Sequence, residues 1–317
     1  MKLPWPFSKS QTTGGDEPEK APSPPVELPP VSEMEGGPGH IEEAIPLPPV
    51  EKHIVENESS DILITAAYGY SIGLHRDKNQ DSIFSLTAHS AGDQKKIPFG
   101  LYIVADGMGG HELGEVASSS AIKAAASHVL EQVYLPFLKD EPVQGEAIEE
   151  ILKQGVKKAR EMVVVNAPEG GTTLTIALIY STTLRIAHIG DSRAYLISPD
   201  NTITPLTRDH SLVKRLEELG QITPEEAAVH PQRNILYRAI GQGEQTEPEM
   251  DTRPLPSDGY ILLCSDGLWG VLAEDEIAQM VTSAHNLREA CNRLIDAANN
   301  NGGPDNISVV LVHFQKR

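Results

Sequence analysis

The chain has 317 residues, of which 39% are hydrophobic and 22% charged, and its formal net charge at pH 7 is −19. That acidity argues against nucleic acid or an anionic membrane surface as the main ligand, because both repel a negatively charged protein. No apolar run reaches the roughly 18 residues of a membrane span, and the chain has only two cysteines, so a membrane-spanning protein and a disulfide scaffold are excluded.

The first 62 residues differ in composition from the rest. They carry 12 acidic and 4 basic residues, and they include proline-rich runs such as APSPPVELPP. Such a segment cannot bury enough apolar surface to offset the entropy of ordering it. We therefore predict a disordered segment at 1–62 and one folded domain at 63–317. The proline-rich runs favour polyproline II, which serves as a semi-rigid tether or as a docking segment for a partner.

The folded part alternates predicted strands and helices. Strands are predicted, in chain order, at 66–74, 81–87, 99–105, 173–180, 183–189, 193–198, 260–265 and 307–314. Helices are predicted at 114–133, 145–164, 274–283 and 286–300, with two short ones inside 205–235. We expect the first two strands to pair with the third, and the three strands from 173 to 198 to form a meander.

Four aspartates stand where a predicted strand ends or begins: Asp106, Asp191, Asp266 and Asp305. Gathered carboxylates repel one another unless cations or water compensate them. An all-oxygen ligand set without Cys or His favours Mg²⁺ or Mn²⁺. We expect Asp106 to bridge two ions, and Gly107 to leave room for its own carbonyl to turn inward as a ligand.

A second group of charged residues lies upstream in GLHRDKNQDSIF. The guanidinium of Arg76 can bind two phosphate oxygens at once, which complements a metal-activated nucleophile. Asp81 can accept hydrogen bonds from metal-bound waters. Taken alone, this stretch also fits an ordinary surface arginine in a salt bridge.

The ordered motifs resemble those of the metal-dependent PPM, or type 2C, protein serine/threonine phosphatases of bacteria. The motifs are RDKNQD at 76–81, DGMGGH at 106–111, GTT at 171–173, GDSRAY at 190–195, DHS at 209–211, HPQRNILYRAIG at 230–241, CSDGL at 264–268 and DN at 305–306. The resemblance covers roughly residues 66–317. It implies an α+β fold, an αββα sandwich of two antiparallel sheets flanked by antiparallel helices, with a flap-like insert at 205–235 near the active-site mouth.

The resemblance also assigns roles to single residues. It implies that Asp106 bridges two core metals, that Gly107 ligates through its carbonyl, and that Asp266 and Asp305 complete the core. Asp191 matches the ligand of a third, weaker metal. Arg76 matches the phosphate-binding arginine and Asp81 an acid that contacts the ions through water.

Two positions depart from many eukaryotic members of this family. Gln80 stands where they carry Glu, and Met108 where they carry a histidine suggested as general acid. His111 is the nearest substitute as proton donor, since an imidazole titrates near neutrality, and a metal-bound water is the other. His111 also fits a turn residue that only forms hydrogen bonds.

The resemblance implies hydrolysis of phosphoserine and phosphothreonine by a metal-bridging hydroxide, with two core Mn²⁺ or Mg²⁺ ions and a possible third. Serine/threonine-phosphorylated proteins and a cognate kinase are the expected partners, and we expect a monomer. Pro4 and Pro6 interrupt any signal-peptide pattern, so we expect a cytoplasmic location. Two alternatives stay open: a catalytically inactive phosphatase-like binding module, and a hydrolase of small phosphate esters.

Overall fold

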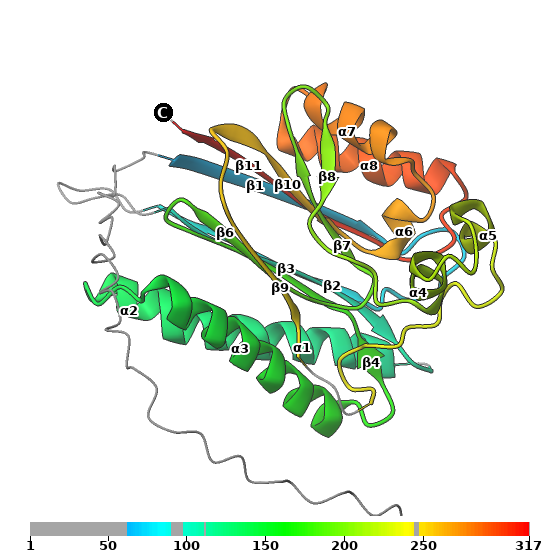
Figure 1. The fold of residues 1–317 in the computed structure, drawn as a ribbon, viewed down its shortest axis with the longest axis horizontal. Helices are drawn as coiled ribbons and strands as arrows, with labels where there is room; N and C mark the ends of the chain where they lie inside the picture. Colours follow the sequence, from blue (N-terminus) through cyan, green and yellow to red (C-terminus); the bar gives the residue numbers. More distant parts are fainter. Residues whose placement is uncertain (1–61, 90–97, 111, 244–246, 317) are drawn as a thin grey trace, which may run out of the picture. The chain divides into compact units, whose positions relative to one another are not determined.

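The computed structural model of the protein describes residues 62–89, 98–110, 112–243 and 247–316. These residues form two antiparallel sheets that pack face to face, with helices on both outer faces (Figure 1). The expected αββα sandwich is therefore confirmed. The predicted segment 1–62 lies outside the described residues except for Ile62, which opens the first strand.

The strands divide into a five-stranded and a six-stranded sheet. The first has the order β1 (Ile62–Ser71), β11 (Ile307–Lys316), β10 (Asp258–Cys264), β7 (Arg193–Ile197) and β8 (Ile203–Pro205). The second has the order β2 (Asp81–Ala88), β3 (Phe99–Met108), β5 (Leu174–Tyr180), β6 (Thr183–Ile189) and β9 (Glu249–Pro254), and the short β4 (Gly171–Thr172) pairs with β3.

Helices cover each sheet on its outer side (Figure 1). The six-stranded sheet is covered by α1 (Leu113–Val129), continued by a π-helical turn (Leu130–Tyr134) and α2 (Leu135–Leu138), and by α3 (Gly145–Asn166). The five-stranded sheet is covered by α6 (Asp266–Trp269), α7 (Glu274–Thr282) and α8 (Leu287–Asn300). The short helices α4 (Leu212–Glu218) and α5 (Pro224–Ala228) lie in the predicted insert.

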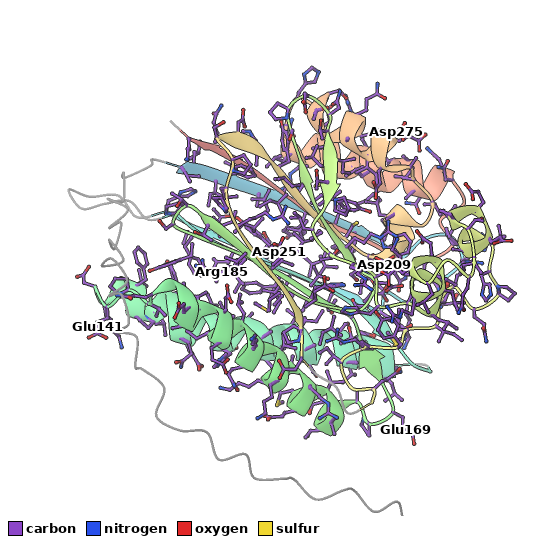
Figure 2. All side chains as sticks on the ribbon, in the orientation of Figure 1. Glu141, Glu169, Arg185, Asp209, Asp251 and Asp275 are labelled. Atoms are coloured by element: carbon purple, nitrogen blue, oxygen red, sulfur yellow. The ribbon has the colours of Figure 1, made fainter. Side chains whose placement is uncertain are left out.

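Three apolar cores separate the four layers, and side chains fill the spaces between them (Figure 2). The position of β3 between two cores explains its unbroken run of apolar residues. Leu101 and Ile103 pack under the helices, whereas Tyr102 and Val104 pack between the sheets. A strand that is buried on both faces needs apolar residues at successive positions rather than at alternate ones.

Two predicted strand pairings are wrong. β1 begins at Ile62 rather than at residue 66, and it pairs with β11 instead of with β3. The predicted meander ends after β6, because β7 crosses into the other sheet and pairs with β10 and β8. The free side of β6 is occupied by β9, a strand that the sequence pattern did not predict.

Local sequence chemistry accounts for the ends of the short helices. Thr223 caps α5 with a capping box, Pro224 is its first residue, and Gly220 has a φ of 66°, which favours glycine. Both cysteines are free and buried. No helix in the described part of the chain is long and apolar enough to cross a membrane.

Candidate active site

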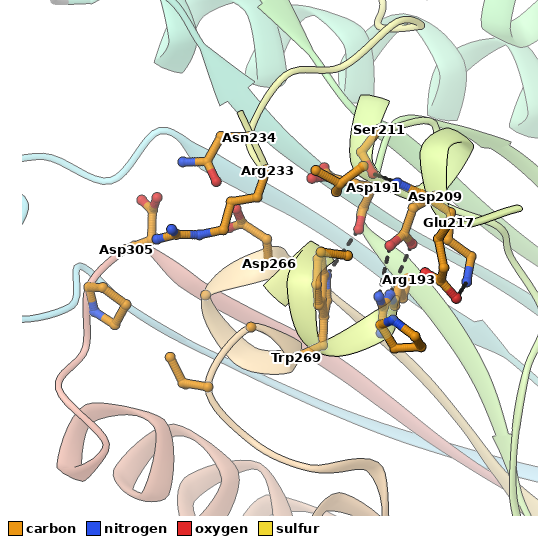
Figure 3. Close-up of a pocket in the computed structure, with 18 of the residues that line it drawn as sticks. Asp191, Arg193, Asp209, Ser211, Glu217, Arg233, Asn234, Asp266, Trp269 and Asp305 are labelled. Carbon is orange, nitrogen blue, oxygen red and sulfur yellow. Dashed lines mark hydrogen bonds and ion pairs between the residues drawn. The ribbon is translucent and has the colours of Figure 1, made fainter. Parts of the chain in front are cut away.

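The four aspartates come together at one end of the sandwich. Asp106 lies near the end of β3, Asp191 in the turn between β6 and β7, Asp266 at the first position of α6, and Asp305 in the loop before β11. Three of them, Asp191, Asp266 and Asp305, line one cleft of about 470 Å³ (Figure 3). The charges of all three act on the carboxyl of Asp106.

This gathering of carboxyls is costly without a cation. Burial raises the pKa of Asp106 well above its usual range, and the neighbouring carboxylates, beginning with Asp81, raise it further. Burial also raises the pKa of Asp266 to about 6, with the Asp305 charge adding to it, and burial followed by the Asp266 charge raises the pKa of Asp191. Positive charge nearby would favour the ionised form of each group.

Asp81 belongs to the same cluster and lies opposite Asp106 in the β2–β3 ladder. Its Oδ2 accepts a hydrogen bond of 2.7 Å from Ser265 Oγ. Burial raises its pKa to about 7. Within the described residues, neither Asp81 Oδ1 nor Asp266 Oδ1 has a hydrogen-bond partner of normal geometry, although both atoms are buried. Buried, unpartnered carboxylate oxygens are suited to a cation or its water ligands.

Gly107 is required by a close approach of two backbones. A Cβ atom at this position would lie 2.1 Å from the Gly114 carbonyl oxygen and 2.6 Å from that of Gln80. The Gly107 N–H donates to the Gln80 carbonyl at 3.1 Å. A side chain here would push the backbone next to Asp106 out of place.

Arg76 pairs with Asp305 across the site. Its Nη2 lies 2.6 Å from Asp305 Oδ2, and the arginine side chain is 48% exposed. The loop that carries Arg76 is fastened by Asn306, whose Oδ1 accepts from Gln80 N at 2.8 Å and whose Nδ2 donates to the carbonyls of Ile72 and Lys78. Arg76 therefore combines a fixed backbone with a guanidinium that faces solvent.

The donor set fits Mn²⁺ or Mg²⁺ in chemistry. Every candidate ligand is an oxygen, two buried carboxylate oxygens lack partners, and the negative charges act on one another. Among the described side chains, no three of the His, Cys, Asp and Glu residues are arranged as ligands of a single ion. Asp305, the fourth candidate ligand, is paired with Arg76 in this structure.

The structure also brings in residues of two motifs to which the sequence gave no role. Asp106 N donates to Thr173 Oγ1 at 2.8 Å, and Thr172 Oγ1 donates to the Asp106 carbonyl at 2.8 Å, so the GTT motif holds the Asp106 backbone on both sides. Arg233, from HPQRN, extends across the cleft toward Asp305 (Figure 3). The only sequence signal for Arg233 was that it is a basic residue in a polar run of the insert. His111 lies outside the described residues.

Comparison with known proteins gives one consistent result. The family model described as protein phosphatase 2C matches residues 69–307. A serine/threonine phosphatase of Listeria welshimeri is 38% identical over 218 residues, covering 67% of this chain and 83% of its own, and protein phosphatase PhpP of Streptococcus pneumoniae is 36% identical over 253 residues, covering 77% and 95%. The catalytic domain of the phosphatase PstP, solved in complex with 2 manganese ions, superposes with a TM-score of 0.64 at 32% identity, covering 80% of this chain and 100% of that one.

Proposed function

Because the chain belongs to the protein phosphatase 2C family and is a metal-dependent protein serine/threonine phosphatase, we propose which of its residues carry the reaction. Asp106, the Gly107 carbonyl, Asp266 and Asp305 hold two core Mn²⁺ or Mg²⁺ ions. Asp191 and Asp266 hold a third, weaker ion. The observation that supports this most is the cluster of mutually repelling carboxyls, in which two buried oxygens have no partner.

When bound, the cations lower the pKa of a coordinated water and so supply the nucleophile for attack on phosphorus. Arg76 binds the phosphate: its guanidinium exchanges the Asp305 carboxylate for two phosphate oxygens and stabilises the charge that grows on them. Asp81, held by Ser265, orients water at the cluster through its free Oδ1. His111 is the proposed donor of the proton to the leaving alkoxide, with a coordinated water as its competitor.

Calorimetric titration of the metal-free protein with Mn²⁺ tests the ligand assignment. Asp106→Asn should remove both core binding events, and Asp191→Asn only the weakest one. Hydrolysis of a phosphothreonine peptide should stop after chelation and return with Mn²⁺. Full turnover in the chelated protein, or unchanged Mn²⁺ binding by Asp106→Asn, would refute the assignment.

The proton donor can be tested separately. If His111 protonates the leaving group, His111→Asn should lower kcat for a phosphoserine peptide but much less for p-nitrophenyl phosphate, whose leaving group needs no proton. Equal losses on both substrates would assign the proton to water instead.

The substrates are phosphoproteins, and we propose that a cognate serine/threonine kinase supplies them. The proline-rich residues 1–62 are the proposed docking segment or tether of a monomeric, cytoplasmic enzyme whose folded domain spans 63–317. Co-purification from cells of the full chain and of a chain lacking residues 1–60 would test the docking, and sedimentation would test the monomer.

A further inference from the structure

The turn between β6 and β7, which carries Asp191, is held from several directions. The backbone N–H of Gly190 donates to the ring nitrogen Nδ1 of His210 at 3.1 Å, and the backbone N–H of His210 donates to the Gly190 carbonyl at 2.7 Å. On the other side, Ser192 Oγ lies 2.7 Å from Thr173 Oγ1, next to the Asp106 backbone. These contacts fix the residues on either side of Asp191.

Asp191 itself is tied to a different part of the chain. The indole Nε1–H of Trp269 donates to the backbone carbonyl of Asp191 at 3.0 Å. Trp269 is the last residue of α6, and Asp266 is the first residue of the same helical turn. The indole N–H therefore joins the turn that carries Asp191 to the turn that carries Asp266. Nothing in the reaction described above uses this contact.

The Trp269 ring is in turn held by Arg193, whose side chain is fixed by Asp209. The guanidinium of Arg193 lies 3.7 Å from the centre of the indole ring. Asp209 binds it in bidentate fashion, with 2.9 Å from Nε to Oδ1 and 2.7 Å from Nη2 to Oδ2. Asp209 is only 6% exposed and stands at the start of the insert. Figure 3 shows Asp209, Arg193 and Trp269 side by side along the cleft wall.

We infer that Trp269 is a positioning residue for the third cation. Resting on the proposed roles of Asp191 and Asp266, the inference is that the indole N–H fixes the distance between these two carboxylates, and that the Arg193–Asp209 pair fixes the indole. The strength of the weakest metal site is thereby linked to the base of the flap, through side chains outside the proposed ligand set.

The variant Trp269→Phe tests this, because it removes the N–H donor and keeps an aromatic ring, although a smaller one, beside Arg193. One hydrogen bond of this kind corresponds to roughly a threefold to tenfold change in an equilibrium constant. We expect the weakest Mn²⁺ binding constant, measured by calorimetry, to fall by roughly that factor, while the two stronger ones and the melting temperature with saturating Mn²⁺ stay close to wild type. Asp209→Asn should weaken the same event by a smaller factor.

Asn301→Ala is the matched control. The Asn301 side chain also donates one hydrogen bond to a backbone carbonyl beside α6, that of Val271 at 2.9 Å, but it does not reach Asp191. This variant should leave all Mn²⁺ binding constants unchanged. In an Asp191→Ala background, Trp269→Phe should add no further change in binding.

Several results would overturn the inference: equal weakening of all three sites by Trp269→Phe, unchanged binding by that variant, or an equal effect of Asn301→Ala. If Asp191→Ala itself leaves the weakest binding event intact, the proposed metal ligands are wrong, and the role of Trp269 that rests on them is overturned as well. Loss of that event in Asp191→Ala together with unchanged binding in Trp269→Phe would overturn the role of Trp269 alone.

Discussion

Replacing Arg76 by alanine separates phosphate binding from metal binding. The guanidinium makes a charge-assisted hydrogen bond of 2.6 Å to Asp305 and is 48% exposed. A preorganised charged donor contributes about 3–4 kcal/mol to transition-state stabilisation in a dry site, and half-exposure lowers this toward about 2–3 kcal/mol. That range corresponds to a loss of roughly 30- to 150-fold in kcat/KM.

The assay is steady-state hydrolysis of p-nitrophenyl phosphate and of a phosphothreonine peptide at saturating Mn²⁺. Arg76→Ala should raise KM and lower kcat together, because the guanidinium binds the phosphate both before and during the reaction. Arg76→Lys keeps the charge but loses the two-pronged geometry, so it should recover only part of the loss. The number of bound Mn²⁺ ions should stay the same, since the proposed ligands are untouched.

The melting temperature of Arg76→Ala is the control for its kinetics. A half-exposed ion pair contributes at most about 1 kcal/mol to stability, so the melting temperature should change little. Values of kcat and KM within twofold of wild type would refute the phosphate-binding role and leave Arg76 as an ordinary partner of Asp305.

Three further predictions concern stability. Gly107→Ala should lower the unfolding free energy in urea by about 1–3 kcal/mol and abolish Mn²⁺ binding, because its Cβ would lie 2.1 Å from the Gly114 carbonyl oxygen; wild-type stability would contradict the close approach. The raised pKa values of Asp81, about 7, and Asp266, about 6, mean that the folded metal-free protein holds protons that the unfolded chain loses above pH 4. Its unfolding free energy should therefore fall between pH 4 and pH 7, Mn²⁺ should reverse the fall, and Asp81→Asn should flatten the slope; a slope that Asp81→Asn leaves unchanged would contradict this. A chain lacking residues 1–60 should melt and hydrolyse p-nitrophenyl phosphate like the full chain, whereas a further deletion through Ser71 removes β1 and should prevent folding; a loss of activity in the shorter deletion would move the domain boundary.

Local chemistry made much of the fold predictable. The helices predicted at 274–283 and 286–300 agree with α7 and α8 to within one residue at each end. The buried strand β3 was predictable from its run of apolar residues. Strand partners did not follow from local pattern, because β1 and β7 are compatible with either sheet and only long-range packing chooses between them. β9 was missed since this edge strand, EMDTRP, is polar and half-exposed along its length and shows no apolar run.

The candidate site was predicted as a set of residues rather than as a geometry. Strand ends beside Asp106, Asp191 and Asp266 indicated a common edge, and the structure brings them together. The contact between Arg76 and Asp305 spans 229 positions, so no spacing in the sequence reveals it. The tie from Trp269 to Asp191 likewise depends on how two sheets meet, which a linear pattern does not encode.

The pairing of β1 with β11 has a consequence for how this protein is made. The register runs from Ile62 opposite Lys316 to Ser71 opposite Ile307. The first described strand therefore cannot pair until the last one has been synthesised. During synthesis the six-stranded sheet, drawn from residues 81 to 254, can form while β1 still has a bare edge that invites aggregation. Asp305 emerges from the ribosome just ahead of β11, whereas Asp106 is made some two hundred residues earlier. The proposed ligand set is therefore complete only once Asp305 has been made, and a chain truncated before β11 should neither close the five-stranded sheet nor bind Mn²⁺ in the core.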